Sequence, residues 1–169
     1  MVYKMNIVLL NPEIHVNTGN IGRSCVATGT RLHLIEPLGF RINEKEIRRA
    51  GMDYWKNLDV TIYSDINDFY EKNPAAREHM YFATTKAHHT YKDVEYKPDD
   101  YIMFGKESAG IPEEILSENE ETCIRIPMWG DIRSLNLSNS VAIILYEALS
   151  QNGFEKMQLT GELHRLTYK

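Results

Sequence analysis

The chain has 169 residues, 43% of them hydrophobic, and a formal net charge of −5. This length suffices for one domain with a sizeable core, and no apolar run approaches the roughly 20 residues of a membrane-spanning helix. An acidic chain repels polyanions, so any nucleic-acid contact requires a local basic patch. The N-terminus lacks the apolar segment of a signal peptide, and Cys25 and Cys123 lie in apolar surroundings. We therefore expect a cytoplasmic protein with reduced thiols.

Strand-like and helix-like segments alternate along the chain. In chain order, the pattern predicts a strand at 6–10, a helix at 18–28, a strand at 32–35, a helix at 44–50, a strand at 60–63, a helix at 66–72, strands at 80–84 and 101–104, a helix at 112–117, a strand at 122–126 and a helix at 138–151. Asn17 or Thr18 is the expected cap of the first helix, and Gly29 its end. This alternation predicts an α/β domain with a largely parallel sheet flanked by helices.

A glycine-containing turn joins the first strand to the first helix. Its sequence is Asn-Thr-Gly-Asn-Ile-Gly-Arg over residues 17–23, which places Arg23 one turn into the helix. The glycines permit close backbone approach, but the G-x-G-x-x-G pattern of dinucleotide-binding proteins is not met. A capped helix with a surface arginine is the simpler alternative on local grounds.

A second polar segment, residues 104–112, follows a strand and opens a helix. Ligands of α/β proteins bind at the carboxyl ends of strands, so a site is expected here. Gly105 and Gly110 permit exposed backbone amides, and Glu107 is able to accept hydrogen bonds. A P-loop is excluded because no Gly-Lys-Ser/Thr is present. A plain turn before a proline-started helix is the alternative.

A third segment carries more small polar residues than a helix start requires. They are Ser134, Asn136, Ser138, Asn139 and Ser140, just ahead of the most apolar helix. Such an excess suggests a helix N-terminus that also holds a ligand. Segments 105–110, 126–128 and 134–140 together offer amides, hydroxyls and apolar contacts but no metal ligands. This combination suits a flat, uncharged, partly apolar ligand.

A basic stretch lies between the second and third strands. Lys45, Arg48 and Arg49 share one helical face, and Tyr54 and Trp55 follow closely. Cations beside aromatic rings favour RNA, since phosphates pair with the cations and bases stack on the rings. The alternative is a solvated face on which neighbouring glutamates pair with the cations.

Taken together, the three polar segments resemble, in order, the three motifs of the SPOUT RNA 2′-O-methyltransferases. The short length and the segments 48–54 and 125–128 are similar to the subgroup that methylates the wobble nucleotide of tRNA. The chain departs from the pattern at Gly22, where a larger apolar residue is commoner, and after Gly153. The resemblance implies a methyltransferase domain over residues 1–155 with a C-terminal trefoil knot, a polar tail over 156–169, and a homodimer.

The resemblance also implies roles for individual residues. Cofactor contacts fall on Ala83, Thr84, Gly105, Glu107, Ile126, Met128, Ser134 and Leu135. Catalytic roles fall on Arg23, facing the ribose across the dimer interface, and on Ser134 and Asn136, whereas Ser138, Asn139 and Ser140 begin the helix. RNA contacts fall on Asn17, Lys45, Arg48, Arg49 and Tyr146.

The implied reaction moves a methyl group from S-adenosylmethionine to the ribose 2′-hydroxyl of nucleotide 34 of tRNA, a cytidine or modified uridine, and leaves S-adenosylhomocysteine. Leucine tRNAs are the expected substrates, contacted at the anticodon stem-loop, with no metal and no membrane. Two alternatives stay open: a non-catalytic RNA-binding dimer of the same fold, and methylation at another RNA position. A nucleotide-dependent oxidoreductase is disfavoured by the broken glycine pattern.

Overall fold

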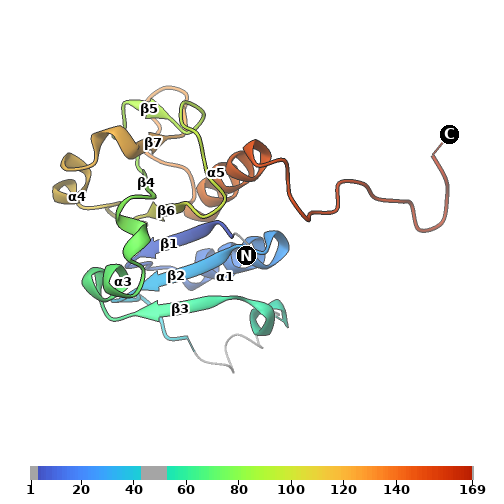
Figure 1. The fold of residues 1–169 in the computed structure, drawn as a ribbon, viewed down its shortest axis with the longest axis horizontal. Coiled ribbons are helices and arrows are strands. Elements are labelled where there is room, and N and C mark those ends of the chain that lie inside the picture. The colour runs from blue at the N-terminus through green and yellow to red at the C-terminus, as the bar shows by residue number, and fades with distance from the viewer. Residues whose placement is uncertain (1–3, 43–52, 169) are drawn as a thin grey trace.

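A computed structural model describes residues 4–42 and 53–168, which form a seven-stranded sheet with helices on both faces (Figure 1). The strands are β1 (Asn6–Leu10), β2 (Arg31–Ile35), β3 (Val60–Tyr63), β4 (Met80–Ala83), β5 (His89–Thr90), β6 (Tyr101–Phe104) and β7 (Cys123–Arg125). The helices are α1 (His15–Thr28), α3 (Ile66–Lys72), α4 (Glu113–Ser117) and α5 (Leu137–Gln151), with 3-10 turns η1 (Asp53–Asn57), η2 (Pro74–Arg77) and η3 (Glu120–Thr122). Every strand pairing is parallel, in the order β3-β2-β1-β6-β4-β7-β5. The predicted α/β architecture is confirmed.

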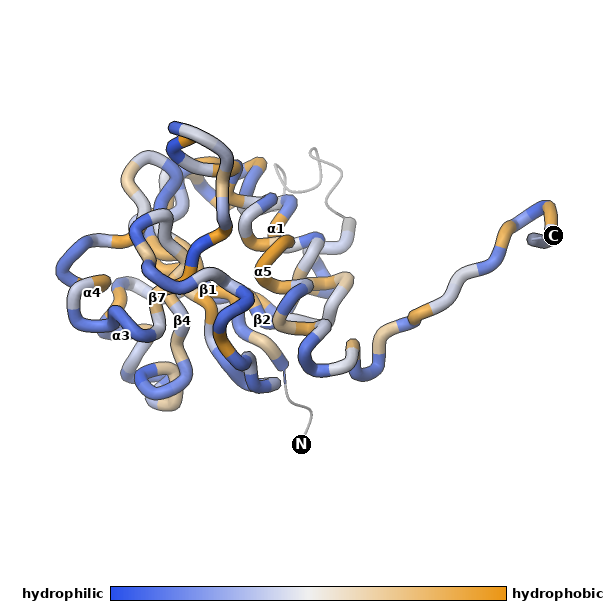
Figure 2. Tube along the Cα trace, turned by 90° about the horizontal axis from the view of Figure 1, so that it is seen from above, coloured by the Kyte–Doolittle hydropathy of each residue, from blue (hydrophilic) through white to orange (hydrophobic). Residues whose placement is uncertain are grey.

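Two apolar cores lie on opposite faces of the sheet. Helices α1 and α5 cover one face and α3 and α4 cover the other (Figure 2). Ile21 and Leu145 belong to a cluster with Ile7 and Leu9 of β1, whereas Phe69 and Leu116 belong to a second cluster with Val8 and Leu10. Successive residues of β1 therefore contribute to opposite cores, because neighbouring side chains of a strand point to opposite faces of the sheet. Both faces are covered, which explains why β1 and β2 are mostly apolar, with Asn6 and His33 as buried polar exceptions.

The start of helix α1 differs from its prediction. The helix begins at His15, three residues early, and its N-cap residue Ile14 makes no side-chain capping bond. The carboxylate of Glu107 instead accepts hydrogen bonds from the backbone N–H groups of Glu13 and Ile14, at 2.7 and 3.2 Å. A distant residue thus supplies the cap that local sequence lacks. The predicted end is correct, because Gly29 adopts a left-handed conformation with φ of 67°.

Other boundaries show smaller differences. Asn136 caps α5, so the helix begins at Leu137, and Ser138, Asn139 and Ser140 form its first turn without providing the cap. Pro112 is the N-cap of α4, just outside the helix. Strand β5 was not predicted because its two residues carry no apolar pattern. The helix expected at 44–50 lies outside the described residues.

Gly22, where the sequence departs from the family pattern, packs against two large side chains. Gly22 is buried, and a Cβ there would lie 3.1 Å from Leu58 Cδ2 and 3.2 Å from Trp55 Cζ3. The large indole therefore occupies the space that a larger residue at 22 would need.

The C-terminal segment leaves the domain after α5. Residues 153–168 run away from the sheet in Figure 1, and most are exposed. None of the helices in residues 4–42 and 53–168 has the length and apolar character that crossing a bilayer requires.

A buried histidine links β2 to its neighbours. His33 is 5% exposed, with Nδ1 2.8 Å from Tyr63 Oη and Nε2 3.1 Å from Asn6 Oδ1. Asn73 Nδ2 donates to Tyr63 Oη, which leaves the tyrosine proton for His33 Nδ1. Both ring nitrogens are thus satisfied in the neutral form, with the proton on Nε2. Burial, assisted by nearby Arg31, lowers the pKa of His33 to about 4.

This pKa predicts acid-sensitive stability. The unfolded chain takes up a proton on His33 below about pH 6.5, whereas the folded chain takes it up only near pH 4. The free energy of unfolding should therefore fall by up to roughly 3 kcal/mol as the pH drops through this window. Urea unfolding at several pH values measures it. His33→Gln should flatten the pH dependence, whereas His88→Gln, at an exposed position, should not; equal slopes in His33→Gln and wild type would contradict the prediction.

Candidate functional site

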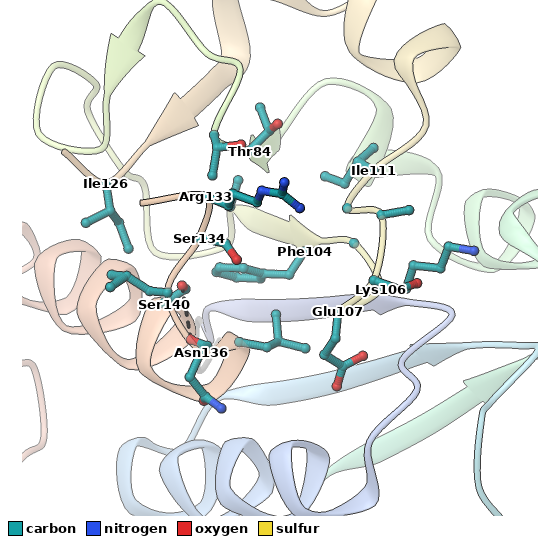
Figure 3. A pocket seen from close by; sticks show the side chains of 18 of the residues that line it. Thr84, Phe104, Lys106, Glu107, Ile111, Ile126, Arg133, Ser134, Asn136 and Ser140 are labelled. Carbon is teal, nitrogen blue, oxygen red and sulfur yellow. Dashed lines mark hydrogen bonds between the residues drawn. The ribbon is translucent and has the colours of Figure 1, made fainter. Parts of the chain in front are cut away.

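A cavity of about 590 Å³ opens where three strands end (Figure 3). The register aligns Ala83 of β4 with Phe104 of β6 and with Ile124 of β7. The residues that follow these strand ends therefore converge, and they are joined there by the connection leading into α5. The predicted cofactor residues that line the cavity are Ala83, Thr84, Gly105, Glu107, Ile126, Met128, Ser134 and Leu135.

The connection from β6 to α4 folds tightly back on itself at Gly105. A Cβ on Gly105 would lie 2.0 Å from the carbonyl carbon of Gly110 and 2.2 Å from the nitrogen of Ile111. The Gly110 N–H donates to the carbonyl of Lys106 at 2.8 Å, and Gly110 itself has a φ of 73°. Only glycine fits at 105, so backbone rather than side chain forms this part of the cavity wall.

Two glutamates fasten this connection to the start of α1. Besides the two backbone donors, Glu107 accepts from Asn17 Nδ2 at 3.0 Å. In return, the Glu13 carboxylate accepts from the backbone N–H and the hydroxyl of Ser108, both at 2.8 Å. These hydrogen bonds from Ser108 lower the pKa of Glu13. The hydrogen bonds of Glu107 and Glu13 together fix the position of the cavity wall relative to α1.

Asn136 extends this network to α5. Its Oδ1 accepts from the backbone N–H groups of Ser138 and Asn139 and from the Ser138 hydroxyl, and its Nδ2 donates to Asn17 Oδ1 at 3.0 Å. Asn17 is buried, with its side-chain amide held between Glu107 and Asn136. One continuous hydrogen-bond chain thus joins the three polar segments.

The remaining predicted site residues lie elsewhere. Arg23 is exposed and does not line the cavity; its guanidinium lies over the Tyr54 ring, 5.0 Å from the centroid. The Tyr54 hydroxyl donates to the carbonyl of Gly19, and burial raises its pKa. Tyr146 is on the exposed side of α5, 44% exposed and away from the cavity. The predicted RNA-binding cations Lys45, Arg48 and Arg49 lie outside the described residues.

Sequence reasoning missed two residues of this region. Glu13 has its partner 95 residues away, so no local pattern could have identified it. Arg133 lines the cavity, and its guanidinium extends across the opening beside Ser134 (Figure 3). Its position directly before the predicted site residue Ser134 was the sequence feature that could have identified it. In the described part of the chain no three His, Cys, Asp or Glu residues are grouped so as to hold a metal ion.

Comparison with known proteins agrees with this arrangement. A model of the SpoU rRNA Methylase family matches residues 4–146. The chain belongs to this family. Its Escherichia coli relative named tRNA (cytidine(34)-2′-O)-methyltransferase is 47% identical over 89% of this chain and 95% of its own length.

Two solved structures extend the comparison. One, described as giving structural insights into the 2-OH methylation of C/U34 on tRNA, has a TM-score of 0.81 and 35% identity, covering 90% of this chain and 99% of its own. The other, an AdoMet-bound rRNA methyltransferase from Sinorhizobium meliloti, has a TM-score of 0.76 and 25% identity, covering 89% and 57%. The chain therefore shares the SpoU methylase fold along nearly its whole length.

Proposed function

We propose that the protein methylates the ribose 2′-hydroxyl of nucleotide 34 in tRNA, a cytidine or modified uridine, with S-adenosylmethionine as donor and leucine tRNAs as substrates. The observation that carries the proposal is the cavity at the ends of β4, β6 and β7, where all three polar segments meet. The Escherichia coli relative bears the name of this activity, and the first of the two solved structures concerns the 2-OH methylation of C/U34 on tRNA.

The cavity fits an adenosine-containing cofactor. About 590 Å³ lies within the usual range for small-molecule sites. Ile126, Leu135 and Ile144 offer an apolar wall for a flat base, and Thr84 and Ser134 offer hydroxyls. The tight turn at Gly105 keeps the backbone close enough to the cavity for its polar groups to bind the cofactor. The same cofactor is bound in the Sinorhizobium meliloti relative.

The reaction needs positioning more than acid–base help. When bound, S-adenosylmethionine supplies an electrophilic methyl group and a neutral leaving group. Ser134, at the cavity mouth, orients the ribose hydroxyl, and alignment alone is worth up to ~7–11 kcal/mol in ideal cases. Asn136 and Asn17 act as positioning residues, because their amides are already engaged with each other and with neighbouring groups. We therefore assign Asn17 to positioning rather than to RNA contact.

Arg23 has a separate role in this proposal. A guanidinium stays protonated and cannot act as a base, so Arg23 stabilises negative charge developing on the ribose oxygen or orients a phosphate beside it. Arg23 lies six residues beyond Asn17, about 9 Å along α1, and it does not line the cavity of its own chain. We therefore propose that Arg23 of a second copy serves this cavity.

A homodimer is consistent with the exposed surface. Ile14 and Val16 of the α1 region and Ile143 and Tyr146 of α5 are large apolar side chains between 37% and 55% exposed. Helices α1 and α5 cover the same face of the sheet, so these side chains offer an apolar area for a second copy.

Three further assignments accompany the proposal. The strand order, with β7 between β4 and β5, and the return of the chain to α1 through Asn136 support a C-terminal trefoil knot. The end of α5 at Gln151 and the exposure of the following residues support a domain over 1–155 and a tail over 156–169. Residence in the cytoplasm follows from the substrate.

Labelled S-adenosylmethionine and total tRNA test the function. The proposal predicts label in tRNA and a 2′-O-methyl group at nucleotide 34 when the product is digested and mapped. Label at another nucleotide would replace the wobble assignment, and RNA binding without label would favour a non-catalytic dimer.

Glu107→Gln should weaken S-adenosylmethionine binding by about tenfold. The substitution removes the charge that strengthens the bonds to Glu13 and Ile14, and charged hydrogen bonds are worth about 1.5–3 kcal/mol. The cavity wall then loses part of its attachment to α1. Calorimetric titration measures the affinity, with Glu120→Gln, at an exposed position beside His88, as the matched control. Unchanged affinity in Glu107→Gln would contradict the positioning role.

A further inference from the structure

Trp129 is the most exposed large apolar side chain of the described residues, at 94%. It lies in the connection between β7 and α5, outside both elements. A tryptophan side chain contributes a large apolar contact area when a binding partner covers it. A solvent-exposed indole therefore indicates a binding surface for another molecule.

The position of Trp129 on the cavity rim follows from its neighbours. Met128, the preceding residue, lines the cavity, and consecutive Cα atoms are about 3.8 Å apart. Gly130, the next residue, has a φ of 61°, so the chain turns directly after the indole. No hydrogen bond joins residues 127–135 to another residue in the described part of the chain, which leaves this connection free to adjust to a ligand.

The rim also carries positive charge. Arg133, four residues after Trp129, is exposed and extends its guanidinium across the opening (Figure 3). Lys106 also lines the cavity. An aromatic side chain next to cations is the combination that proteins use for unpaired nucleotides, since bases stack on the ring and phosphates pair with the cations.

We infer that Trp129 stacks on a nucleobase next to the methylated nucleotide while Arg133 contacts the adjacent phosphate. This inference rests on the proposed function and adds a substrate-binding residue to it. Trp129 selects for unpaired RNA, because a base inside a duplex does not offer its face. The indole then holds the anticodon loop over the cavity.

Three substitutions test the need for an aromatic ring. Trp129→Ala and Trp129→Leu should each raise KM for tRNA about tenfold, with kcat changed less than threefold and cofactor affinity unchanged. Trp129→Phe should stay within about threefold of wild type, because it retains a face for stacking. If Trp129→Leu matches Trp129→Phe, or if no variant changes KM, stacking is excluded.

Fluorescence tests stacking independently of methyl transfer. The chain has two tryptophans, so Trp55→Phe leaves Trp129 as the sole indole. An anticodon stem-loop RNA should quench its emission, and a fully paired RNA of equal length should not. Absence of quenching by a stem-loop that binds would overturn the inference.

The outcomes separate the two proposals. If wild type methylates nucleotide 34 and Trp129→Leu does so with the same KM, only stacking fails. If wild type transfers no methyl group to tRNA, the proposed function fails, and the quenching experiment still decides whether Trp129 meets a base. A change of oligomeric state on sedimentation of Trp129→Ala would make Trp129 a subunit contact and overturn the inference.

Discussion

Arg23→Ala is expected to lower the rate of methyl transfer to tRNA at least about 100-fold while S-adenosylmethionine binds as in wild type. The magnitude follows from loss of one group that stabilises charge at the reacting oxygen, typically 10²–10³ in kcat. Cofactor affinity is spared because Arg23 does not line the cavity of its own chain. Single-turnover transfer to tRNA and calorimetric titration of the cofactor measure the two quantities.

A matched control is available on another part of the surface. Arg77 is also exposed and also lies over a tyrosine ring, that of Tyr70, at 4.5 Å. Arg77→Ala removes the same type of contact and should leave transfer unchanged. Full activity in Arg23→Ala would remove Arg23 from the mechanism.

Mixing two inactive variants tests whether Arg23 acts across subunits. Arg23→Ala and Ser134→Ala are each expected to be inactive. In a mixed dimer, one of the two sites combines Ser134 of the Arg23→Ala chain with Arg23 of the Ser134→Ala chain, so that site is intact. If subunits pair at random, about half of the dimers are mixed, and co-refolding should restore roughly a quarter of wild-type activity. If Arg23 acted in its own chain, no intact site would form and activity would stay near zero.

Gly105→Ala is expected to weaken S-adenosylmethionine binding at least about 100-fold. A Cβ at 2.0 Å from Gly110 cannot be accommodated by a rotamer change, because the obstacle is backbone. The connection from β6 to α4 must move, and Glu107 moves with it. Titration of the cofactor measures the loss, with circular dichroism to verify folding.

Gly161→Ala is the control for Gly105. No atom lies within 4 Å of a Cβ at Gly161, which is in the exposed tail, so cofactor binding should be unaffected. Binding by Gly105→Ala within threefold of wild type would contradict the assignment of the 105–110 backbone to the cofactor site.

The sequence was sufficient to predict the sheet and most of the residues that form the cavity wall. Mostly apolar segments identify six of the strands, and the residues directly after parallel strands must meet at one edge of the sheet. Gly105, Ile126 and Ser134, from the three segments expected at the sheet ends, therefore line one cavity. The start of α1 was not predictable, because its cap comes from Glu107, about 90 residues away.

Asn136 illustrates a second limit of prediction from sequence, the choice of the helix cap. Five small polar residues compete for one helix start, and local rules cannot decide which of them provides the cap. The structure selects Asn136, because its amide also reaches Asn17. Local chemistry indicated only a flat, uncharged ligand, so the methyl donor and the reaction came from the resemblance of three segments together.

A tRNA that lacks a single hydroxyl group identifies the methyl acceptor. A leucine tRNA is assembled with a 2′-deoxy nucleotide at position 34 and ordinary riboses elsewhere, and it is compared with the all-ribose tRNA in labelled methyl transfer. We expect stoichiometric methylation of the all-ribose tRNA and none of the deoxy form, which should still compete for binding. Equal methylation of both would contradict the assignment of the 2′-hydroxyl of nucleotide 34 as the acceptor.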